Sequence, residues 1–322
     1  MNIIVLGAGT FGTAIANELS VNRANTVFLY SNSEEKVLEI NSQHTNRSFF
    51  PNKQLTKQLK ATSDNSVFQN ASVIFIALPS DKIINSLKTL KPYFKEDVLL
   101  VNLSKGLFNN GLTIVESIKN ELNFNNVVTL KGPSFAVEVI EHADTLLTLG
   151  YTNKEQSNLV YKAIKDTSLY IDSTNDVQGV ELLSVMKNVF ALALGVIDAK
   201  YNSPNTRFMI LTKSFSEVRF LLKLLGGSED TLFLACGFGD LCMTSLNDLS
   251  RNRTLGLLIG KGFFNSDYKS NSVILEGLNA IKIFHDLLDK DYSNELPIFY
   301  KLYNYFLNKE ESLEFKFNEL IQ

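Results

Sequence analysis

The sequence predicts an α/β Rossmann-type domain, with a doubly wound sheet, followed by an all-α C-terminal domain. Through residue 176, short runs rich in β-branched residues alternate with helical patterns, an arrangement that builds a parallel sheet covered on both faces. A glycine-rich segment, GAGTFG, directly follows the first of these runs. After residue 176 strand signals vanish and long helical windows take over. We therefore expect a sheet domain over residues 1–176 and an all-helical domain over residues 177–322.

Each half has its own set of expected elements. In the first half we expect strands at 2–6, 26–30, 73–78, 98–103, 127–130, 145–150 and 168–171. Helices are expected at 11–21, 81–90 and 154–165, and another is expected to start near Glu34. In the second half we expect helices at 180–199, 212–225, 255–259, 275–288 and 297–307. Glycines at 226–227 and 237–239 predict tight connections, and those at 260 and 262 predict a helix end.

Composition narrows the class of protein. The 322 residues suit two domains, and the formal net charge of -3 leaves no basic field for non-specific nucleic-acid binding. Cys236 and Cys242 lack the spacing of a zinc ribbon or a disulfide framework, which favours a reduced, cytoplasmic location. His44, His142 and His285 are scattered, so no metal is expected.

No segment reads as a membrane or export signal. The first ten residues, MNIIVLGAGT, carry neither a basic region nor a cleavage site and are expected to form a strand. The longest apolar stretch, residues 189–197, is shorter than the ~20 residues of a spanning helix. We therefore expect a protein that is not an integral membrane protein.

The glycine-rich segment predicts a dinucleotide site. Gly7, Gly9 and Gly12 form a GxGxxG pattern between a predicted strand and a predicted helix. The first glycine permits a tight turn, the second lets the backbone approach a pyrophosphate, and the third lets helix pack on strand. The alternative is an ordinary glycine-rich turn with no ligand.

The end of the second predicted strand bears on the choice of cofactor. An NAD-selective site usually has Asp or Glu there to bind the ribose hydroxyls, and this chain has Ser31 and Asn32. No carboxylate repels a 2′-phosphate and no adjacent Arg attracts one, so either NAD or NADP is allowed. The two side chains are expected to bind the ribose or, alternatively, to cap the helix near Glu34.

Two further strand ends carry polar residues. Lys105 follows the strand at 98–103, and Gly132, Pro133 and Ser134 follow the strand at 127–130. Ligands of open α/β sheets bind beyond the carboxyl ends of the strands, so these residues are candidates for binding. The alternatives are a solvated lysine and a helix start with Pro133 in its first turn.

Polar residues in the second half predict the chemistry. Lys187 and Asn188 interrupt a helix that is apolar nearly all round, so they either face a polar cavity or snorkel to the surface. A lysine facing a cavity is competent to exchange a proton with a substrate oxygen. Asp240 is its candidate ion-pair partner, and Thr244 follows in the same cluster.

A basic segment predicts an anion site. Ser250, Arg251, Asn252 and Arg253 stand at the start of an apolar helix. Arginine side chains and helix-terminal N–H groups together suit a phosphoryl group. The alternative is a charged helix cap.

These segments together resemble the NAD(P)-dependent glycerol-3-phosphate dehydrogenases. The motifs, in chain order, are GAGTFGTA, SKGL, KGPSFAVE, GVELLSVMKNV, GFGDLCMTS, SRNRTLG and LEG. The resemblance implies a Rossmann domain joined to an all-helical domain with the active site in the crevice between them, and a homodimer. It implies reversible hydride transfer between dihydroxyacetone phosphate and sn-glycerol 3-phosphate, in the service of phospholipid synthesis.

The resemblance also implies roles for individual residues. Lys187 would be the acid/base, Lys105 would polarise the substrate and Asp240 would orient the polar set. Substrate contacts would come from Lys105, Gly132, Ser134, Lys187, Asn188, Asp240, Thr244, Ser250, Arg251 and Asn252. Cofactor contacts would come from Gly7, Gly9, Thr10, Phe11, Gly12, Ser31, Asn32, Lys105, Ala136, Arg251, Ile274 and Glu276.

The chain departs from the family pattern at two segments. Residues 205–214 replace a smaller, Ala-rich helix, and Lys213 stands where the family usually has Arg. Residues 46–51 lack the Tyr-Leu-Pro-Gly sequence that the family usually has at this place. Two other functions stay open on the sequence alone: a related reductase of a 2-keto or β-hydroxy acid, and a dinucleotide-sensing module without catalysis.

Overall fold

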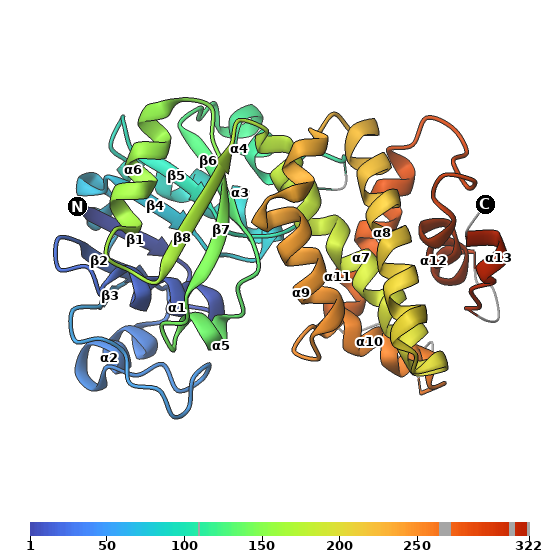
Figure 1. Cartoon of the computed structure of the whole chain (residues 1–322). Helices are drawn as coiled ribbons and strands as arrows, with labels where there is room; N and C mark the ends of the chain where they lie inside the picture. The colour runs from blue at the N-terminus through green and yellow to red at the C-terminus, as the bar shows by residue number, and fades with distance from the viewer. Residues whose placement is uncertain (109, 264–271, 309–312, 321–322) are drawn as a thin grey trace. The chain divides into compact units, whose positions relative to one another are not determined.

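The structure is a computed structural model that describes residues 1–108, 110–263, 272–308 and 313–320, with the side chains of 272–276, 278 and 319 left undescribed (Figure 1). The chain groups into two compact units. The first comprises Met1–Lys105 and Ile114–Val177, and the second comprises Gly106–Thr113 and Gln178–Gln322.

The first unit contains a sheet in the order β3-β2-β1-β4-β5-β6-β7-β8. Neighbouring strands are parallel except for the β6/β7 pair, which is antiparallel. The strands are β1 Asn2–Leu6, β2 Thr26–Tyr30, β3 Lys60–Thr62, β4 Val73–Ile76, β5 Leu99–Asn102, β6 Val127–Lys131, β7 Thr145–Gly150 and β8 Leu169–Thr174. The strand order reverses between β1 and β4, and such a reversal opens a ligand crevice at the carboxyl ends of the strands.

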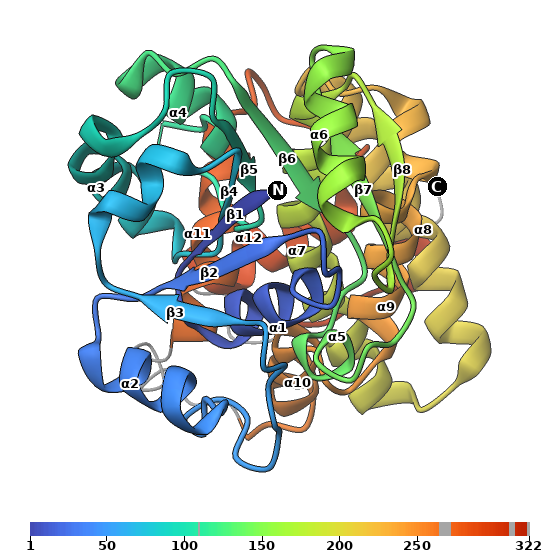
Figure 2. The same ribbon diagram turned by 90° about the vertical axis from the view of Figure 1, so that its left-hand side faces the viewer.

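Helices cover both faces of this sheet. They are α1 Thr10–Leu19, α2 Glu34–Gln43, α3 Ser80–Leu90, α4 Ile114–Leu122, α5 Ala136–Val139 and α6 Lys154–Ile164, with short 3₁₀ turns η1 Asn65–Asn70 and η2 Lys91–Tyr93. Because crossovers are right-handed and the strand order reverses at β1, α1 and α2 lie on one face and α3 and α4 on the other (Figure 2). Burial on both faces explains why β4, VIFI, is apolar throughout.

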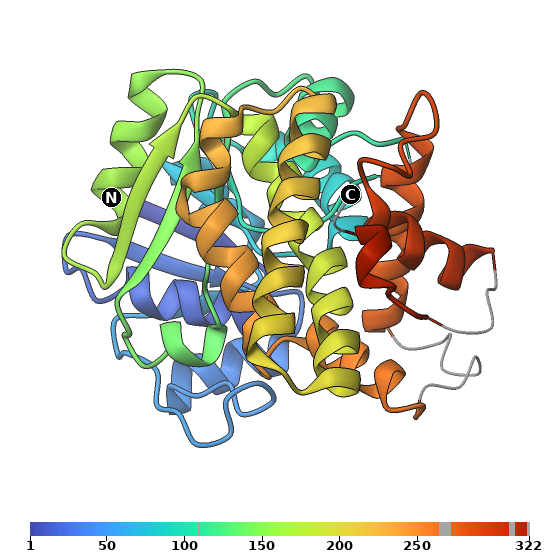
Figure 3. The ribbon, with the colours of Figure 1, turned by 45° about the vertical axis from the view of Figure 1, so that its right-hand side comes forward.

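The second unit is helical. Its elements are α7 Val177–Tyr201, α8 Pro204–Leu224, η3 Glu229–Phe233, the π-turn η4 Ala235–Gly239, α9 Asp240–Leu246, α10 Arg251–Gly260, α11 Ser272–Asp286, α12 Pro297–Leu307 and α13 Phe317–Leu320. The other helices of this unit gather around α7 (Figure 3). Helix α7 is long and apolar enough to cross a membrane, but 94% of its most apolar window is buried inside the protein. Its composition is therefore explained by its place in the core.

The predicted fold class is confirmed, and all seven predicted strands are present. Strand β3 was missed because it is a three-residue strand at the sheet edge with only Ala61 buried. Helix α8 begins at Pro204 and not at 212, because Ser203 caps the helix and proline is favoured in the first turn. Gly260 is the last residue of α10 and Gly262 lies two residues beyond it, so these glycines do mark a helix end.

Three short helices also differ from expectation. Helix α4 was missed although its buried residues Ile114, Ile118 and Leu122 recur at helical spacing. Helix α9 was missed because the glycines at 237–239 predicted a tight connection, whereas they form a π-turn that continues into the helix. Helix α5 begins at Ala136, so the alternative of a helix start with Pro133 in its first turn is not what the structure shows.

A buried carboxyl joins two helices of the second unit. Glu217 of α8 accepts hydrogen bonds from the backbone N–H groups of Ile298, at 2.8 Å, and Phe299, at 2.9 Å. It therefore supplies acceptors to the start of α12, whose own N-cap residue, Leu296, makes no side-chain cap. Burial raises the pKa of Glu217 from 4.5 to about 8, against the opposing effect of the two N–H donors and of Lys213.

This environment predicts a pH-dependent stability. Between about pH 4.5 and 8 the folded protein keeps Glu217 protonated while the unfolded chain ionises it, so the free energy of unfolding falls as pH rises. We expect a contribution of at most about 1.4 kcal/mol per pH unit in that window, measured by chemical denaturation. Glu217→Gln should flatten this slope, and an unchanged slope in the variant would contradict the assignment.

Candidate dinucleotide and substrate sites

The glycine loop between β1 and α1 is shaped by close backbone packing. Gly7 has a positive φ of 116°, and a Cβ there would lie 2.6 Å from the carbonyl oxygen of Ala77. A Cβ on Gly12 would lie 1.9 Å from the carbonyl oxygen of Gly7. Gly9 is the N-cap residue of α1, and a Cβ there would meet nothing within 4 Å. The first and third glycines are therefore required by the fold, and the second leaves open space in front of the helix N-terminus.

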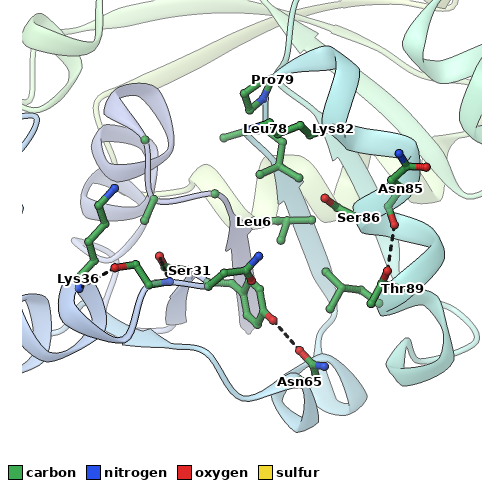
Figure 4. A pocket seen from close by; sticks show the side chains of 18 residues that line it. Leu6, Ser31, Lys36, Asn65, Leu78, Pro79, Lys82, Asn85, Ser86 and Thr89 are labelled. Carbon is green, nitrogen blue, oxygen red and sulfur yellow. Dashed lines mark hydrogen bonds between the residues drawn. The ribbon is translucent and has the colours of Figure 1, made fainter.

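That space belongs to a pocket of about 630 Å³, within the size range of ligand sites (Figure 4). Its walls come from the loops after β1, β2 and β4 and from α3. The lining residues are Leu6, Gly7, Ala8, Gly9, Tyr30, Ser31, Asn32, Ser33, Lys36, Asn65, Ala77, Leu78, Pro79, Lys82, Asn85, Ser86, Thr89 and Leu90. The pocket thus lies at the reversal of the strand order, beyond the carboxyl ends of the strands, where an α/β sheet binds a dinucleotide.

Ser31 and Asn32 both line this pocket, and neither caps α2. The cap is Ser33, whose hydroxyl accepts from the N–H of Lys36 at 3.4 Å. Ser31 instead accepts at its hydroxyl from the N–H of Ser33, at 3.2 Å, and stabilises the turn. Asn32 is exposed. Capping was therefore the wrong alternative for these two residues.

The other expected cofactor residues lie apart from the pocket lining. Thr10 is exposed at the start of α1, and Phe11 and Ala136 pack against the core of the sheet unit. Helices α1 and α5, which carry them, contact each other. The side chains of Ile274 and Glu276 lie outside the described residues.

A buried lysine that was not among the predicted site residues fixes the loop that carries Lys105. Lys131, at the end of β6, is 2% exposed, and its ammonium donates to the carbonyl oxygens of Asn102, at 3.1 Å, and Ser104, at 2.5 Å. The hydroxyl of Ser104 in turn donates to the carbonyl oxygen of Leu78, at 2.6 Å. The loop is thus fixed from two sides, with the half-buried Lys105 next in the chain. A lysine ending an apolar strand was the sequence signal for this role.

The segment after β6 also folds tightly. A Cβ on Gly132 would lie 2.9 Å from the carbonyl oxygen of Leu146 in β7, so the chain passes close to that strand. The hydroxyl of Ser134 donates to the carbonyl oxygen of Gly132 at 3.1 Å. These two candidate residues therefore follow directly after Lys131 in the same unit.

Lys187 lies inside the helical unit and does not snorkel to the surface. It is 5% exposed, and its ammonium pairs with the carboxylate of Asp240 and donates to the hydroxyl of Thr244 at 2.9 Å. That hydroxyl also donates to the Asp240 carboxylate, at 3.4 Å. Asp240 is fully buried, as the first residue of α9 after the π-turn. The half-buried Asn188 follows on α7.

The two arginines of the basic segment have different environments. Arg251 is exposed, whereas Arg253 is 6% exposed and donates to Asp198, at 2.5 Å, and to Asp248, at 3.0 Å. Arg207 of α8 donates to the second oxygen of Asp198 at 2.6 Å. Two carboxylates therefore already engage the guanidinium of Arg253, and Arg251 is the exposed arginine of the segment.

Two features position helix α10: the ion pairs of Arg253 with Asp198 and Asp248, called here the Arg253 clamp, and two closely packed glycines. A Cβ on Gly195 of α7 would lie 2.2 Å from the carbonyl oxygen of Arg253, and one on Gly256 of α10 would lie 2.1 Å from that of Leu192. Ser250 caps the helix by accepting from the N–H of Arg253 at 3.3 Å. The buried Oδ1 of Asn252 has no hydrogen-bond partner among the described residues, so it is an acceptor suited to a ligand donor.

The described residues contain no group of three or more His, Cys, Asp or Glu that could hold a metal ion. The expected Lys187–Asp240 pair is present. Cys236 and Cys242 are free cysteines.

A Rossmann-type sheet with a glycine-loop pocket, joined in one chain to a helical unit with a buried Lys–Asp pair, is the structure of a dinucleotide-dependent dehydrogenase. Two family models match the chain: NAD-dependent glycerol-3-phosphate dehydrogenase N-terminus over residues 2–157, and the C-terminus of the same family over residues 176–315. The chain belongs to this family, and it is an NAD(P)-dependent oxidoreductase.

Individual relatives agree with that assignment. The glycerol-3-phosphate dehydrogenase (NAD(P)+) of Methanothermobacter thermautotrophicus is 33% identical over 94% of this chain and 92% of its own length. The crystal structure of glycerol-3-phosphate dehydrogenase from Coxiella burnetii has a TM-score of 0.83 at 27% identity, over 96% of this chain and 95% of that chain. The Saccharomyces cerevisiae enzyme has a TM-score of 0.85 at 20% identity over 97% of each chain, which shows a shared fold.

The role of Lys131 as a support for the Lys105 loop is testable. Lys131→Met removes the donors to two buried carbonyl oxygens and should lower the free energy of unfolding by about 1–3 kcal/mol. Hydrogen exchange at residues 103–106 should speed up. Lys162→Met, which removes an exposed lysine of the same unit, is the control. Equal stability and equal exchange in the two variants would refute the role.

Proposed function

We propose that this protein interconverts dihydroxyacetone phosphate and sn-glycerol 3-phosphate, with residues 1–176 binding the nicotinamide dinucleotide and residues 177–322 supplying the acid/base and the phosphate site. The observation that carries the proposal is the buried Lys187 ammonium, paired with Asp240 and bonded to Thr244. A buried ion pair costs desolvation free energy, so it is weak evidence for stability and stronger evidence for chemistry.

The glycine-loop pocket fits a dinucleotide. Gly9 leaves the N-terminus of α1 open, and the pocket volume of about 630 Å³ is adequate for the adenosine and diphosphate. When bound, the nicotinamide exchanges a hydride with the substrate carbon. Thr10, Phe11, Ala136, Ile274 and Glu276 are further proposed cofactor residues. No metal is proposed, because the proposed proton transfer and phosphate binding use side chains and backbone N–H groups of the protein.

Lys187 is proposed as the proton donor and acceptor. As the C2 carbonyl carbon receives the hydride, the carbonyl oxygen takes a proton from the Nζ ammonium and becomes the C2 hydroxyl. In the reverse direction the neutral amine takes that proton back. Asp240 and Thr244 orient the ammonium, and Asp240 balances its charge in the buried site. Lys105 polarises the same oxygen, on a loop that Lys131 fixes.

The start of α10 is proposed to bind the substrate phosphate. The exposed guanidinium of Arg251 offers bidentate donors, and the helix N-terminus adds N–H groups beside Ser250. The buried Oδ1 of Asn252 is proposed to accept from a substrate hydroxyl. Gly132, Ser134 and Asn188 are proposed to complete the contacts to the glycerol part. Arg251 is also proposed to reach the cofactor.

The cellular context is part of the same proposal. Glycerol 3-phosphate would feed glycerophospholipid synthesis, and the enzyme would work in the cytoplasm as a homodimer. The free cysteines and the buried apolar helix α7 are consistent with that location.

The reaction and the role of Lys187 are tested together. The purified protein should oxidise NADH or NADPH only when dihydroxyacetone phosphate is present, followed by loss of reduced-nicotinamide absorbance. Lys187→Ala should lower kcat at least ~100-fold, because the proton donor is lost. The variant should still bind the dinucleotide.

The control for this variant is Lys223→Ala, which removes an exposed lysine of α8 whose side chain is 74% exposed. Its kcat should stay within about twofold of the original. No turnover by the unmodified protein with either cofactor would refute the reaction. A near-normal kcat for Lys187→Ala would assign that lysine a structural role.

The phosphate site makes a separate prediction. Arg251→Ala should raise KM for dihydroxyacetone phosphate by about 10-fold or more, because a charge-assisted contact to the phosphate is lost. The matched control is Arg219→Ala, which removes an arginine of α8 whose side chain is 61% exposed. Steady-state kinetics with varied substrate measures both. An unchanged KM for Arg251→Ala would remove the arginine from the site.

A further inference from the structure

The loop between α2 and β3 is closed on itself and packed on the sheet unit. The carbonyl oxygen of His44 accepts from the N–H of Leu55 at 2.7 Å, which brings the two ends of the loop together. The side chains of Phe50 and Leu55 are buried in the core of the sheet unit. We call residues 44–56 the Ω-loop, since compact loops of this kind have adjacent ends and pack through their own side chains. It contains residues 46–51, the segment that departs from the family pattern.

Buried polar side chains along α1 hold one end of the Ω-loop. Thr13, Asn17 and the C-cap residue Ser20 recur at helical spacing, so they lie on one face of the helix, and each is at most 1% exposed. The N–H of Thr56 donates to the side-chain oxygen of Asn17 at 2.7 Å. The hydroxyls of Thr56 and Ser20 are hydrogen-bonded at 2.5 Å. This end of the Ω-loop is therefore fixed to the last turn of α1.

Asn46 fixes the other end, at the glycine loop. Its side chain is fully buried, and its amide nitrogen donates to the hydroxyl of Thr13, at 2.9 Å, and to the carbonyl oxygen of Ala8, at 3.4 Å. Its backbone carbonyl oxygen accepts from the N–H groups of Phe49 and Phe50, which fixes the point from which the side chain leaves. The amide Oδ1 is buried without a hydrogen-bond partner among the described residues. Because such an acceptor is costly, packing alone does not explain an asparagine here.

We propose that Asn46 is a positioning residue, which holds the glycine loop in the orientation that binds the diphosphate of the dinucleotide. This inference rests on the proposed function. The peptide between Ala8 and Gly9 is planar and trans, so its C=O and its N–H point in opposite directions. By holding the Ala8 carbonyl oxygen, Asn46 directs the N–H of Gly9 away from the Ω-loop. N–H groups at a helix start have no partner within the helix and suit an anion. Asn46 does not line the pocket, so it acts through the glycine loop.

The two ends of the Ω-loop make a matched comparison. Asn46 and Thr56 both join this loop to buried side chains along α1, and of these contacts only that of Asn46 to Ala8 reaches the glycine loop. Loosening either end should therefore affect stability alike. Loosening the Asn46 end should in addition weaken dinucleotide binding.

The first experiment removes the donor. Asn46→Leu keeps nearly the same side-chain size but donates no hydrogen bond to the glycine loop. Titration calorimetry of the full chain should show Kd rising about 10-fold for NADH and for NADPH, because the diphosphate is common to both. In steady-state kinetics the KM for the dinucleotide should rise similarly, while kcat at saturating dinucleotide changes less than about twofold. An unchanged Kd would overturn the role of Asn46.

The same substitution at each end of the Ω-loop sharpens the test. Thr13→Val removes the hydroxyl that accepts from Asn46 and should raise both Kd values at least about fivefold. Thr56→Val removes the hydroxyl bonded to Ser20 and should leave them within about twofold. Chemical denaturation should show similar losses of stability in the two variants. Equal Kd values in the two would overturn the proposal, even where Asn46→Leu fails to fold.

Binding and turnover by the original protein separate this inference from the proposed function. Dinucleotide binding that depends on Asn46, without turnover of dihydroxyacetone phosphate, would refute the reaction and support the positioning role. Turnover together with an unchanged Kd in Asn46→Leu would do the reverse. Failure to bind either dinucleotide would overturn both.

Discussion

The helical unit is organised around one buried ion pair. The ammonium of Lys187 lies within an otherwise apolar helix, and it is tolerated there because Asp240 and Thr244 supply a charge and an acceptor. The π-turn before α9 brings the Asp240 carboxylate to it. The apolar residues of α7 pack against the neighbouring helices, so the helix that carries the buried ion pair also supplies much of the core of this unit.

The sheet unit follows a different constraint, close approach of backbone to backbone. Gly7 and Gly12 allow α1 to start directly against β1 and β4, and Gly9 leaves the helix N-terminus open toward the pocket. In the loop after β5, the ammonium of Lys131 donates to the carbonyl oxygens of Asn102, the last residue of β5, and of Ser104. Both devices place polar backbone groups at the carboxyl edge of the sheet.

Much of this architecture was predictable because its signals are local. The glycine spacing, the alternation of strand and helix, and the isolated Lys187 each follow from short stretches of chain, and all seven expected strands occur. The pairing of Arg253 with Asp198 was not predicted, because nothing in the short stretch around Asp198 marks it as the partner of an arginine 55 positions away. The same holds for Glu217 at the start of α12. The sequence of residues 250–253 shows that the segment is basic, but it does not show which of the two arginines forms ion pairs with carboxylates of the same unit.

Helix α7 carries both Lys187 and Asp198, the residue that anchors the Arg253 clamp. Eleven positions correspond to about three helical turns and roughly 16 Å along the axis, so the two side chains leave the helix in nearly the same direction. Helix α7 thus fixes the spacing between the Lys187–Asp240 ion pair and the Asp198–Arg253 ion pair. A single-residue insertion between them would rotate one side chain by about 100° around the helix axis relative to the other, so the two ion pairs could not both keep their present geometry.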